Sequence, residues 1–280
     1  MVKNTRFGVL YIVSTPIGNL KDISKRALEC LSSVDLCAAE DTRKSKLLFD
    51  SYNIKTKLVS YHKFSEKKRL EYLTSKLKGG LSIALISNAG TPVISDPGQI
   101  LIKRAQEESI NIVPIPGPSS PISALSVSGF SADKFSFYGF PPRKKKDKNL
   151  FMKSLISEEK TSIVFESKRR IIDFLLDLKK LDSQRNIFVA REMTKLHESF
   201  YKGNIDEVIK KISNSLKVLK GEFVVVVEGK NRVEKEIILE TEQEEVIKIL
   251  LKSMNRKEAL SLSAKAFNIK RNILYSKFIH

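Results

Sequence analysis

The sequence predicts an α/β protein made of two α/β domains and a small helical extension. Short apolar runs typical of buried strands alternate with helical patterns over residues 1–117, which predicts a mostly parallel sheet with helices on both faces. Strands and helices follow in a different order over 118–235, which predicts a second domain with a mixed sheet. Residues 240–280 show helical spacing throughout, so we expect a helical extension there.

Four strands are expected in the first domain, at 9–13, 36–39, 83–86 and 112–115. Between the first two, an apolar stripe at helical spacing predicts a helix with Asp22 as its N-cap. Its members are Ile23, Ala27, Cys30, Leu31 and Val34. Another helix is expected over 100–108. Because these strands are expected to be parallel, their carboxyl ends should share one sheet edge, where open α/β sheets bind ligands.

Each of the four strands runs into a polar or glycine-rich segment. These segments are 14–19 (STPIGN), 40–43 (EDTR), 87–98 (SNAGTPVISDPG) and 116–120 (PGPSS). Glycine lets the backbone approach a ligand closely, and proline holds a loop in shape beforehand. One such loop is equally well read as a structural turn. Four in succession favour a binding crevice along this edge.

The second domain is expected to contain strands at 135–138, 162–165, 186–190 and 222–227, with helices at about 169–181 and 204–216. The prolines of 118–121 suggest the hinge between the domains. In the extension, Asn255 is expected to begin a helix as part of a capping box and Asn268 to end it. Three short basic helices would resemble a helix-turn-helix module. Such a module either packs as an appendage or contacts nucleic acid.

The chain is strongly basic, with 50 Lys and Arg against 32 Asp and Glu and a net charge of +18. Such a charge favours a polyanionic partner, although general lysine usage accounts for part of it. The run 143–148 (RKKKDK) follows a Gly-Phe-Pro-Pro segment and is expected in a loop. It is either simply solvated or in contact with phosphates, through Arg143, Lys144, Lys145, Lys146 and Lys148.

Several classes of protein are disfavoured. No run of 18 apolar residues exists and no signal peptide is seen at the N-terminus, so we expect a cytoplasmic protein with no membrane segment. The two cysteines lie in apolar surroundings, and the three histidines lack metal-ligand spacing, so no metal is expected. The glycine-rich dinucleotide motif, the P-loop and the serine-nucleophile motif are all absent.

As a set, the strand-end motifs resemble the tetrapyrrole (corrin/porphyrin) methylase superfamily, and within it the branch that methylates small-subunit ribosomal RNA. Further matching motifs are 138–142 (YGFPP), 165–167 (FES), 190–195 (AREMTK) and 221–229 (GEFVVVVEG). The resemblance covers about residues 8–230, and the tail resembles the helical extension of that branch. The chain departs from the family pattern at two places: it has Asn88 where members usually have Asp, and Lys168–Arg169 where members usually have Pro-His.

The resemblance implies that S-adenosyl-L-methionine binds in a cleft between two α/β domains and that the protein is a homodimer. It implies transfer of a methyl group to the ribose 2′-oxygen of a cytidine in the decoding region of 16S rRNA, naked or in a ribosomal particle. The residues expected to bind the cofactor are Pro16, Ser87, Asn88, Ala89, Gly90, Thr91, Ile94, Ser119, Ser120, Phe165, Glu166, Phe223 and Val224. Lys168 and Arg169 join the basic run as expected RNA contacts.

Transfer to a ribose hydroxyl calls for a general base and for close alignment of the reacting atoms. The catalytic candidates are Glu40, Asp41, Arg43 and Glu192, which follow strands and so face the expected crevice. The same residues, with Arg191, would equally suit a structural ion-pair network. Two alternative functions stay open: methylation of a small corrin or porphyrin precursor, and RNA binding without catalysis by a ribosome-assembly factor.

Overall fold

The structure is a computed structural model that describes residues 7–214, 221–230, 241–269 and 271–278. The predicted boundaries at 235 and 240, and the predicted helix end at 215–216, lie outside these residues. Met1–Lys230 form one compact unit and Asn231–His280 form a second. None of the described helices is long and apolar enough to cross a membrane.

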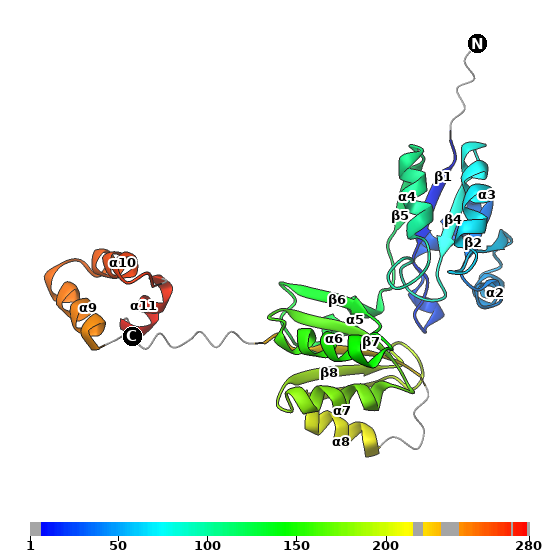
Figure 1. The fold of residues 1–280 in the computed structure, drawn as a ribbon. Coiled ribbons are helices and arrows are strands. Elements are labelled where there is room, and N and C mark those ends of the chain that lie inside the picture. Colours follow the sequence, from blue (N-terminus) through cyan, green and yellow to red (C-terminus); the bar gives the residue numbers. More distant parts are fainter. Residues whose placement is uncertain (1–6, 215–220, 231–240, 270, 279–280) are drawn as a thin grey trace, which may run out of the picture. The chain divides into compact units, whose positions relative to one another are not determined.

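The first sheet has five parallel strands in the order β3-β2-β4-β1-β5 (Figure 1). They are β1 (Val9–Val13), β2 (Leu36–Ala39), β3 (Lys57–Ser60), β4 (Ile83–Ile86) and β5 (Asn111–Ile115). The four predicted strands are confirmed. The fifth, β3, was not predicted because it is an edge strand of four residues with only Val59 buried, so it shows no apolar run.

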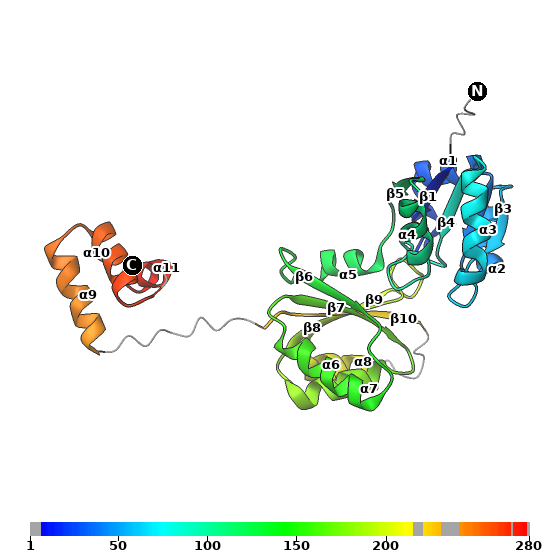
Figure 2. The same cartoon turned by 45° about the horizontal axis from the view of Figure 1, so that its top comes forward.

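Helices cover both faces of this sheet, as the strand–helix alternation predicted (Figures 1 and 2). On one face pack α1 (Lys25–Ser33) and α2 (Thr42–Ser51), and on the other pack α3 (Glu66–Lys78) and α4 (Gln99–Glu107). The predicted N-cap at Asp22 is wrong. Leu20–Asp22 form a short 3₁₀ turn, and α1 begins later, where the Ser24 hydroxyl accepts the Ala27 amide at 3.1 Å.

The second sheet is mixed, as predicted, with the order β6-β7-β10-β8-β9. Only β6 and β7 are parallel, and the other pairings are antiparallel. Its strands are β6 (Phe135–Gly139), β7 (Thr161–Ser167), β8 (Asn186–Arg191), β9 (Ser199–Asn204) and β10 (Glu222–Val227). The polar edge strand β9 was not predicted, because its sequence SFYKGN contains no buried apolar run.

Alternate residues of β10 serve two cores, as the two-residue period of a strand requires. Phe223, Val225 and Val227 pack with α6 (Lys145–Ser157), α7 (Ile171–Leu181) and α8 (Ile205–Asn214). Val224 and Val226 pack with α5 (Ser120–Ser128) on the opposite face (Figure 2). This second core includes Ile17 from the loop after β1, so the part of the unit built on the first sheet and the part built on the second share apolar contacts.

The expectation that the basic run 143–148 lies in a loop is wrong over Lys145–Lys148, which form the first turn of α6. The helix is stabilised here because Asp147 lies in its first turn and Lys148 Nζ contacts Asp177 Oδ2 of α7 at 2.7 Å. The apolar face that anchors α6, including Met152 and Leu155, begins only after the charged run.

The described part of the second unit contains three helices, as predicted: α9 (Thr241–Ser253), α10 (Arg256–Ala266) and α11 (Arg271–Phe278). Asn255 caps α10 by accepting the Lys257 amide at 2.9 Å, and Asn268 follows the helix in the left-handed conformation, φ 51°. Ile247, Leu260, Ile269 and Leu274 form the small core.

Candidate functional site

The loops after β1 and β4 are joined by backbone hydrogen bonds at the carboxyl edge of the first sheet. The Thr15 amide donates to the Gly90 carbonyl and the Gly90 amide donates to the Thr15 carbonyl, each at 2.9 Å. Gly90 has φ 79°, a conformation that glycine adopts without strain. Both polar backbone groups of Gly90 are therefore engaged within the protein, and they join the loops after β1 and β4.

A threonine extends this connection to the loop after β5. The Thr91 hydroxyl lies 3.0 Å from the Ser14 hydroxyl and donates to the Pro118 carbonyl at 3.1 Å. Three of the strand ends are thus held together before any ligand binds. Such preorganisation reduces the conformational entropy that binding would otherwise remove.

The rest of the 87–98 loop has an unusual backbone. Val93 and Ser95 have φ values of 76° and 72°, which non-glycine residues rarely adopt and a β-branched residue almost never does. Gly98, φ 135°, lies so close to Leu85 that an added Cβ would be 2.7 Å from its Cδ2. Backbone strain of this kind is concentrated at functional sites in proteins.

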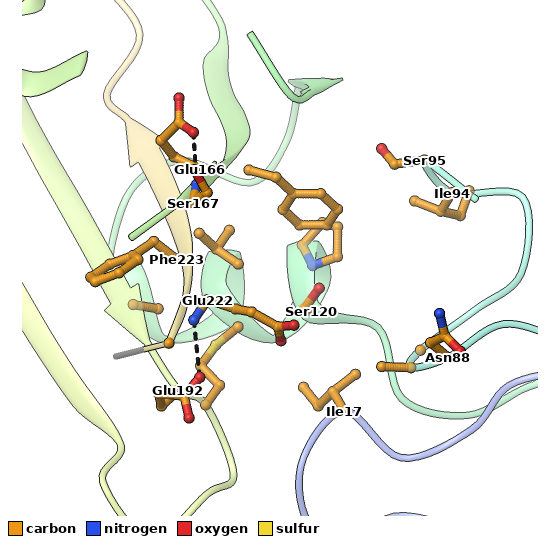
Figure 3. Close-up of a pocket in the computed structure, with 18 of the residues that line it drawn as sticks. Ile17, Asn88, Ile94, Ser95, Ser120, Glu166, Ser167, Glu192, Glu222 and Phe223 are labelled. Atoms are coloured by element: carbon orange, nitrogen blue, oxygen red, sulfur yellow. Dashed lines mark hydrogen bonds between the residues drawn. The ribbon is translucent and has the colours of Figure 1, made fainter. Parts of the chain in front are cut away.

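These loops line one pocket of about 780 Å³, within the range typical of small-molecule sites (Figure 3). The four predicted strand ends all contribute to it, and most of the other lining residues come from the second sheet and the segments that follow its strands. The lining residues are Ile17, Glu40, Lys44, Asn88, Ala89, Gly90, Thr91, Ile94, Ser95, Asp96, Ser119, Ser120, Pro121, Phe140, Phe165, Glu166, Ser167, Lys168, Arg169, Ala190, Glu192, Met193, Lys195, Gly221, Glu222, Phe223 and Val224.

Most of the residues expected to bind the cofactor lie in this lining, together with Glu40, Glu192, Lys168 and Arg169. Pro16 and Ser87 lie outside it. The Ser87 carbonyl accepts the Thr15 hydroxyl at 3.4 Å and so takes part in the connection between the loops after β1 and β4. The basic residues Arg143, Lys144, Lys145, Lys146 and Lys148 also lie outside the lining.

Asp41 and Arg43 lie outside the pocket lining too. Asp41 is the N-cap of α2 and accepts the Arg43 amide at 3.0 Å, while its carboxylate pairs with the Arg43 guanidinium, Nη2 to Oδ2, at 3.0 Å. These hydrogen bonds hold the pKa of Asp41 down to about 2. In this arrangement the pair stabilises the start of α2, and Lys44 is the residue of this first helical turn that reaches the pocket.

Two carboxylates lie together on the pocket wall formed by the first sheet. Burial, with the negative charge of Glu40 as a second cause, raises the pKa of Asp96 to about 6. Glu40 Oε2 in turn accepts the Asn88 amide at 3.1 Å. A carboxylate with a pKa close to neutrality can take up and release a proton at working pH, as a general base must. Asp96 was not among the catalytic candidates, because burial beside a second carboxylate is not visible in a linear motif.

Two pocket residues present buried acceptor atoms that have no hydrogen-bond partner within the described part of the chain: Asn88 Oδ1 and Glu166 Oε2. The other oxygen of Glu166 accepts the Ser167 amide at 2.7 Å and Arg170 Nε at 2.8 Å. Unpaired buried acceptors cost free energy, so both positions suit a ligand that carries hydrogen-bond donors. Phe165 and Phe223 also belong to the pocket lining, and Figure 3 shows Phe223 together with Glu166 and Asn88. The Phe165 side chain lies on the α5 face of the sheet, whereas the Phe223 side chain is buried in the core on the other face.

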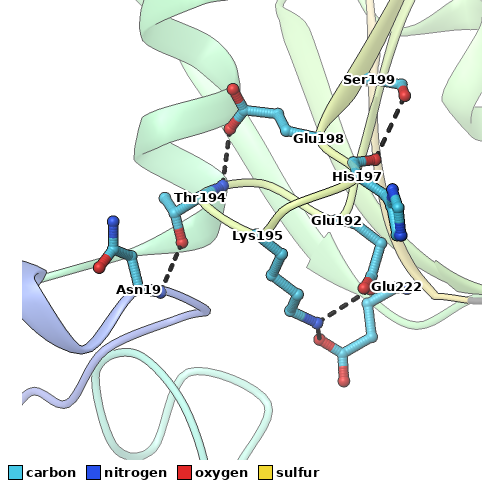
Figure 4. A network of polar contacts seen from close by, with 8 residues as sticks. All are labelled: Asn19, Glu192, Thr194, Lys195, His197, Glu198, Ser199 and Glu222. Atoms are coloured by element: carbon cyan, nitrogen blue, oxygen red, sulfur yellow. Dashed lines mark hydrogen bonds and ion pairs between the residues drawn. The ribbon is translucent and has the colours of Figure 1, made fainter.

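The segment 192–198, here called the bridging loop, connects the second sheet to the loop after β1 (Figure 4). The Thr194 hydroxyl accepts the Asn19 amide at 3.0 Å. Lys195 Nζ contacts Glu192 Oε1 at 2.9 Å and Glu222 Oε2 at 3.3 Å. Burial would raise the pKa of Glu192, but the hydrogen bonds from Lys195 and from the Glu222 amide outweigh it and hold that pKa below its usual range. Glu192 therefore remains an anion in the pocket wall.

Several lining residues were not predicted from the sequence, among them Lys44, Phe140, Lys195 and Glu222. Phe140 and Lys195 belong to segments that were recognised as motifs, but nothing in those motifs shows which side chain faces a cavity. Among the described residues, no group of three or more His, Cys, Asp or Glu is placed to hold a metal ion.

Comparison with known proteins gives three results. The family model for tetrapyrrole (corrin/porphyrin) methylases matches residues 9–209. The chain is similar to proteins named ribosomal RNA small subunit methyltransferase I. It is 42% identical over 268 residues to that of Vibrio cholerae, covering 95% of this chain and 93% of the relative. It is 40% identical over 269 residues to that of Haemophilus influenzae, with 96% and 95% covered.

Solved structures with this fold include uroporphyrin-III C-methyltransferase from Thermus thermophilus, with a TM-score of 0.52 at 16% identity, covering 79% of this chain and 94% of that one. Cobalt precorrin-4 methyltransferase has a TM-score of 0.56 at 13% identity, with 78% and 94% covered. These similarities concern the fold alone. Together with the family match and the full-length relatives, they place the chain in the tetrapyrrole methylase family, in the group of ribosomal RNA small subunit methyltransferase I.

Proposed function

We propose that this protein is an S-adenosylmethionine-dependent methyltransferase that modifies the ribose 2′-oxygen of a cytidine in the decoding region of small-subunit rRNA. One observation carries the proposal: the segments after the four predicted strand ends line a single pocket with the second sheet. The names of the relatives support RNA of the small ribosomal subunit as the substrate.

The pocket residues fit the cofactor. Asn88 Oδ1 and Glu166 Oε2 are buried acceptors suited to its amino and hydroxyl donors, and the Phe165 ring suits the face of an adenine ring. The expected contact of Phe223 would be made by its backbone, because its side chain is buried in the core with α6, α7 and α8. The carboxylate of the cofactor's methionine part suits the start of α5, where the Ser119 side chain makes no capping hydrogen bond within the described residues. When bound, S-adenosylmethionine supplies a methyl group on a positively charged sulfur.

The remaining chemistry belongs to the protein. A ribose hydroxyl becomes a good nucleophile only when its proton leaves, and we assign its removal to Asp96 next to Glu40. The rigid loops after β1, β4 and β5 align the reacting groups. Because Asp96 has to be deprotonated to act, the transfer rate should fall as the pH drops below about 6.

The charge of the chain supports RNA over a small molecule as the substrate. The net charge is +18, and Lys168 and Arg169 bring positive charge to the pocket lining itself. The solved structures with the same fold are named uroporphyrin-III C-methyltransferase and cobalt precorrin-4 methyltransferase, which is why a small tetrapyrrole is the alternative substrate. Residues 143–148 lie outside the pocket lining and would contact RNA phosphates beyond the target nucleotide.

The decisive experiment is transfer of a radiolabelled methyl group by the pure protein to small ribosomal subunits, with naked rRNA and porphyrin precursors as parallel substrates. Label should appear in RNA, and ribose-methylation mapping should place it on one cytidine 2′-oxygen. Label in the porphyrin precursor would support the small-molecule alternative. RNA binding without transfer, under conditions where the cofactor binds, would support an assembly factor.

We also propose that the protein is a cytoplasmic homodimer, as the resemblance implies. Light scattering should then give twice the chain mass of 31.7 kDa. A monomer mass at working concentration would contradict this part of the proposal without affecting the chemistry.

A further inference from the structure

The loop after β3 presents an aromatic ring to solvent. Phe64 is 91% exposed, although phenylalanine is usually buried. Its ring meets the His62 ring edge to face, with centroids 6.2 Å apart and an interplanar angle of 63°. A single exposed apolar residue needs no explanation by itself, so the surroundings of Phe64 decide whether it has a role.

The loop that carries Phe64 is tightly hydrogen-bonded. The His62 amide donates to the Ser65 hydroxyl at 2.9 Å, and the Ser65 amide donates back to the His62 carbonyl at 2.7 Å. The Glu66 amide donates to the same carbonyl at 3.0 Å. The backbone on both sides of Phe64 is thus fixed, and a rigid loop holds its ring out in water.

The same loop is connected to the pocket. Glu66 Oε1 accepts the amide of Gly98, the last residue of the 87–98 loop, at 2.9 Å, and it accepts the Tyr61 hydroxyl at 3.3 Å. The Tyr61 amide donates to the carbonyl of Ala39, the residue before Glu40, at 2.8 Å. Phe64 therefore stands on the carboxyl edge of the first sheet, the edge that bears the pocket.

Lysines flank Phe64 along this loop and the start of α3. Lys63, Lys67 and Lys68 are exposed, and none of them takes part in an ion pair with another described residue. On the neighbouring turn at the end of β2, the side chain of Arg43 is 90% exposed and Lys44 lines the pocket. We call Lys63, Phe64, Lys67 and Lys68 the aromatic-basic patch.

From this arrangement we infer that the aromatic-basic patch binds single-stranded RNA beside the target nucleotide, with an unpaired base stacked on Phe64 and phosphates against the three lysines. The inference rests on the proposed function and extends it, because it places a second binding surface for the substrate outside the pocket. Exposed aromatic rings flanked by cations are how proteins bind single strands. A protein partner would be expected to meet a wider apolar surface around the ring.

The test measures the affinity of the full-length protein for a short fluorescein-labelled single-stranded RNA by fluorescence anisotropy at several salt concentrations. Phe64→Ala should weaken binding roughly 5- to 100-fold, the usual effect of losing one stacked base. Phe64→Tyr keeps a stacking ring and should bind like the wild type. Phe64→Leu keeps apolar area without a ring and should behave like Phe64→Ala.

The lysines give an independent readout. The triple variant Lys63→Ala/Lys67→Ala/Lys68→Ala should reduce the slope of log affinity against log salt, by about 0.7 for each phosphate that is no longer neutralised. Phe64→Ala should leave that slope unchanged. Leu181→Ala, at an exposed leucine that ends α7, serves as the surface control and should change neither quantity.

Unchanged RNA affinity of Phe64→Ala, with normal cofactor binding, would overturn the inference. It would also be overturned if Phe64→Ala lost methyl transfer to ribosomal particles while binding naked RNA normally, because the ring would then contact a protein. The anisotropy measurement needs no methyl transfer. It decides the inference even if the transfer experiment refutes the proposed function.

Discussion

At the scale of single residues, the chemistry of the pocket depends most on Asp96 and its carboxylate neighbour Glu40. The raised pKa of Asp96, about 6, has burial as its main cause and the charge of Glu40 as the second. Neither cause is visible in the sequence, where the two residues lie far apart. The motif that contains Asp96 could be recognised from sequence, but its protonation behaviour could not.

The raised pKa predicts a pH-dependent cost to stability. Below about pH 4 the carboxyl is protonated in both the folded and the unfolded protein, so folding carries no penalty there. As the pH rises from about 4 to about 6, the carboxyl loses its proton in the unfolded protein first, so the free energy of unfolding falls. Asp96→Asn lacks this titration. Its free energy of unfolding should therefore rise relative to that of the wild type by about 1 kcal/mol as the pH increases from about 4 to 7, a value already discounted for partial solvent exposure.

Urea denaturation of both proteins at several pH values measures this difference. Asp133→Asn, the same substitution at an exposed residue, is a suitable control and should show a much smaller change over this range. A constant difference between Asp96→Asn and the wild type across these pH values would show that Asp96 titrates normally.

Gly90 also acts at this scale. Its φ of 79° is strained for any side chain, and an added Cβ would lie 3.4 Å from Ile17 Cγ2. Gly90→Val should disturb the paired hydrogen bonds with Thr15 and weaken binding of S-adenosylmethionine by about 100-fold or more. The protein should stay folded, because the apolar cores on the faces of the two sheets remain. Isothermal titration calorimetry measures the loss, and circular dichroism checks the fold.

Gly79→Ala provides a matched control, because Gly79 ends α3 with φ −75° and an added Cβ would make only 3.4 Å contacts. This variant should bind the cofactor normally. Normal binding by Gly90→Val as well would remove the 87–98 loop from the cofactor site.

At the scale of elements, strands with apolar runs were predictable, and the two edge strands without such a run, β3 and β9, were not. β1, β2 and β4 lie inside the sheet and show their burial in the sequence, and the edge strand β5 still carries the apolar run NIVPI, whereas the edge strands β3 and β9 have no such run. The first turn of α6 was predicted as a loop because its lysines hide the helical pattern that begins with Met152. The sequence thus identifies an element that carries an apolar pattern and misses one in which charged or polar residues interrupt it.

The bridging loop is the element most open to test. Lys195 lies between Glu192 and Glu222, and its removal would leave two carboxylates facing each other. Lys195→Met should therefore raise the pKa of Glu192 above its wild-type value and weaken cofactor binding by roughly 10-fold, the effect of about 1.4 kcal/mol.

Carbon-13 NMR of labelled glutamate carboxyls follows the titration of Glu192. Lys195→Arg keeps the positive charge, so the pKa of Glu192 should stay low in this variant. If the Glu192 pKa were the same in Lys195→Met as in the wild type, the low value would have to come from the Glu222 amide and the charge of Arg191.

At the scale of the whole molecule, every residue that lines the pocket lies between Ile17 and Val224, inside the first compact unit. The second unit has its own core and carries ten Lys and Arg against seven Asp and Glu from residue 231 onward, only +3 of the net +18. Most of the excess positive charge therefore belongs to the unit that holds the pocket.

Removal of residues 231–280 should consequently leave the affinity for S-adenosylmethionine within about 2-fold of the full chain, because every pocket residue remains in place. Calorimetry on the two proteins makes the comparison, and thermal unfolding checks that the shortened chain is folded. A large drop in cofactor affinity in a folded protein would show that the second unit contributes to the site.

By itself the sequence determined the alternation of strands and helices, the four strand ends that meet at one edge, and the family. These features are written in local apolar patterns and short motifs, which need no knowledge of distant neighbours. Only the tertiary structure decided that Glu192 and Glu222 meet Lys195, that Asp96 lies beside Glu40, and that Phe64 stays exposed. The order of the strands within each sheet brings the charged residues together, and burial, charge and exposure depend on distances in space that spacing along a chain does not specify.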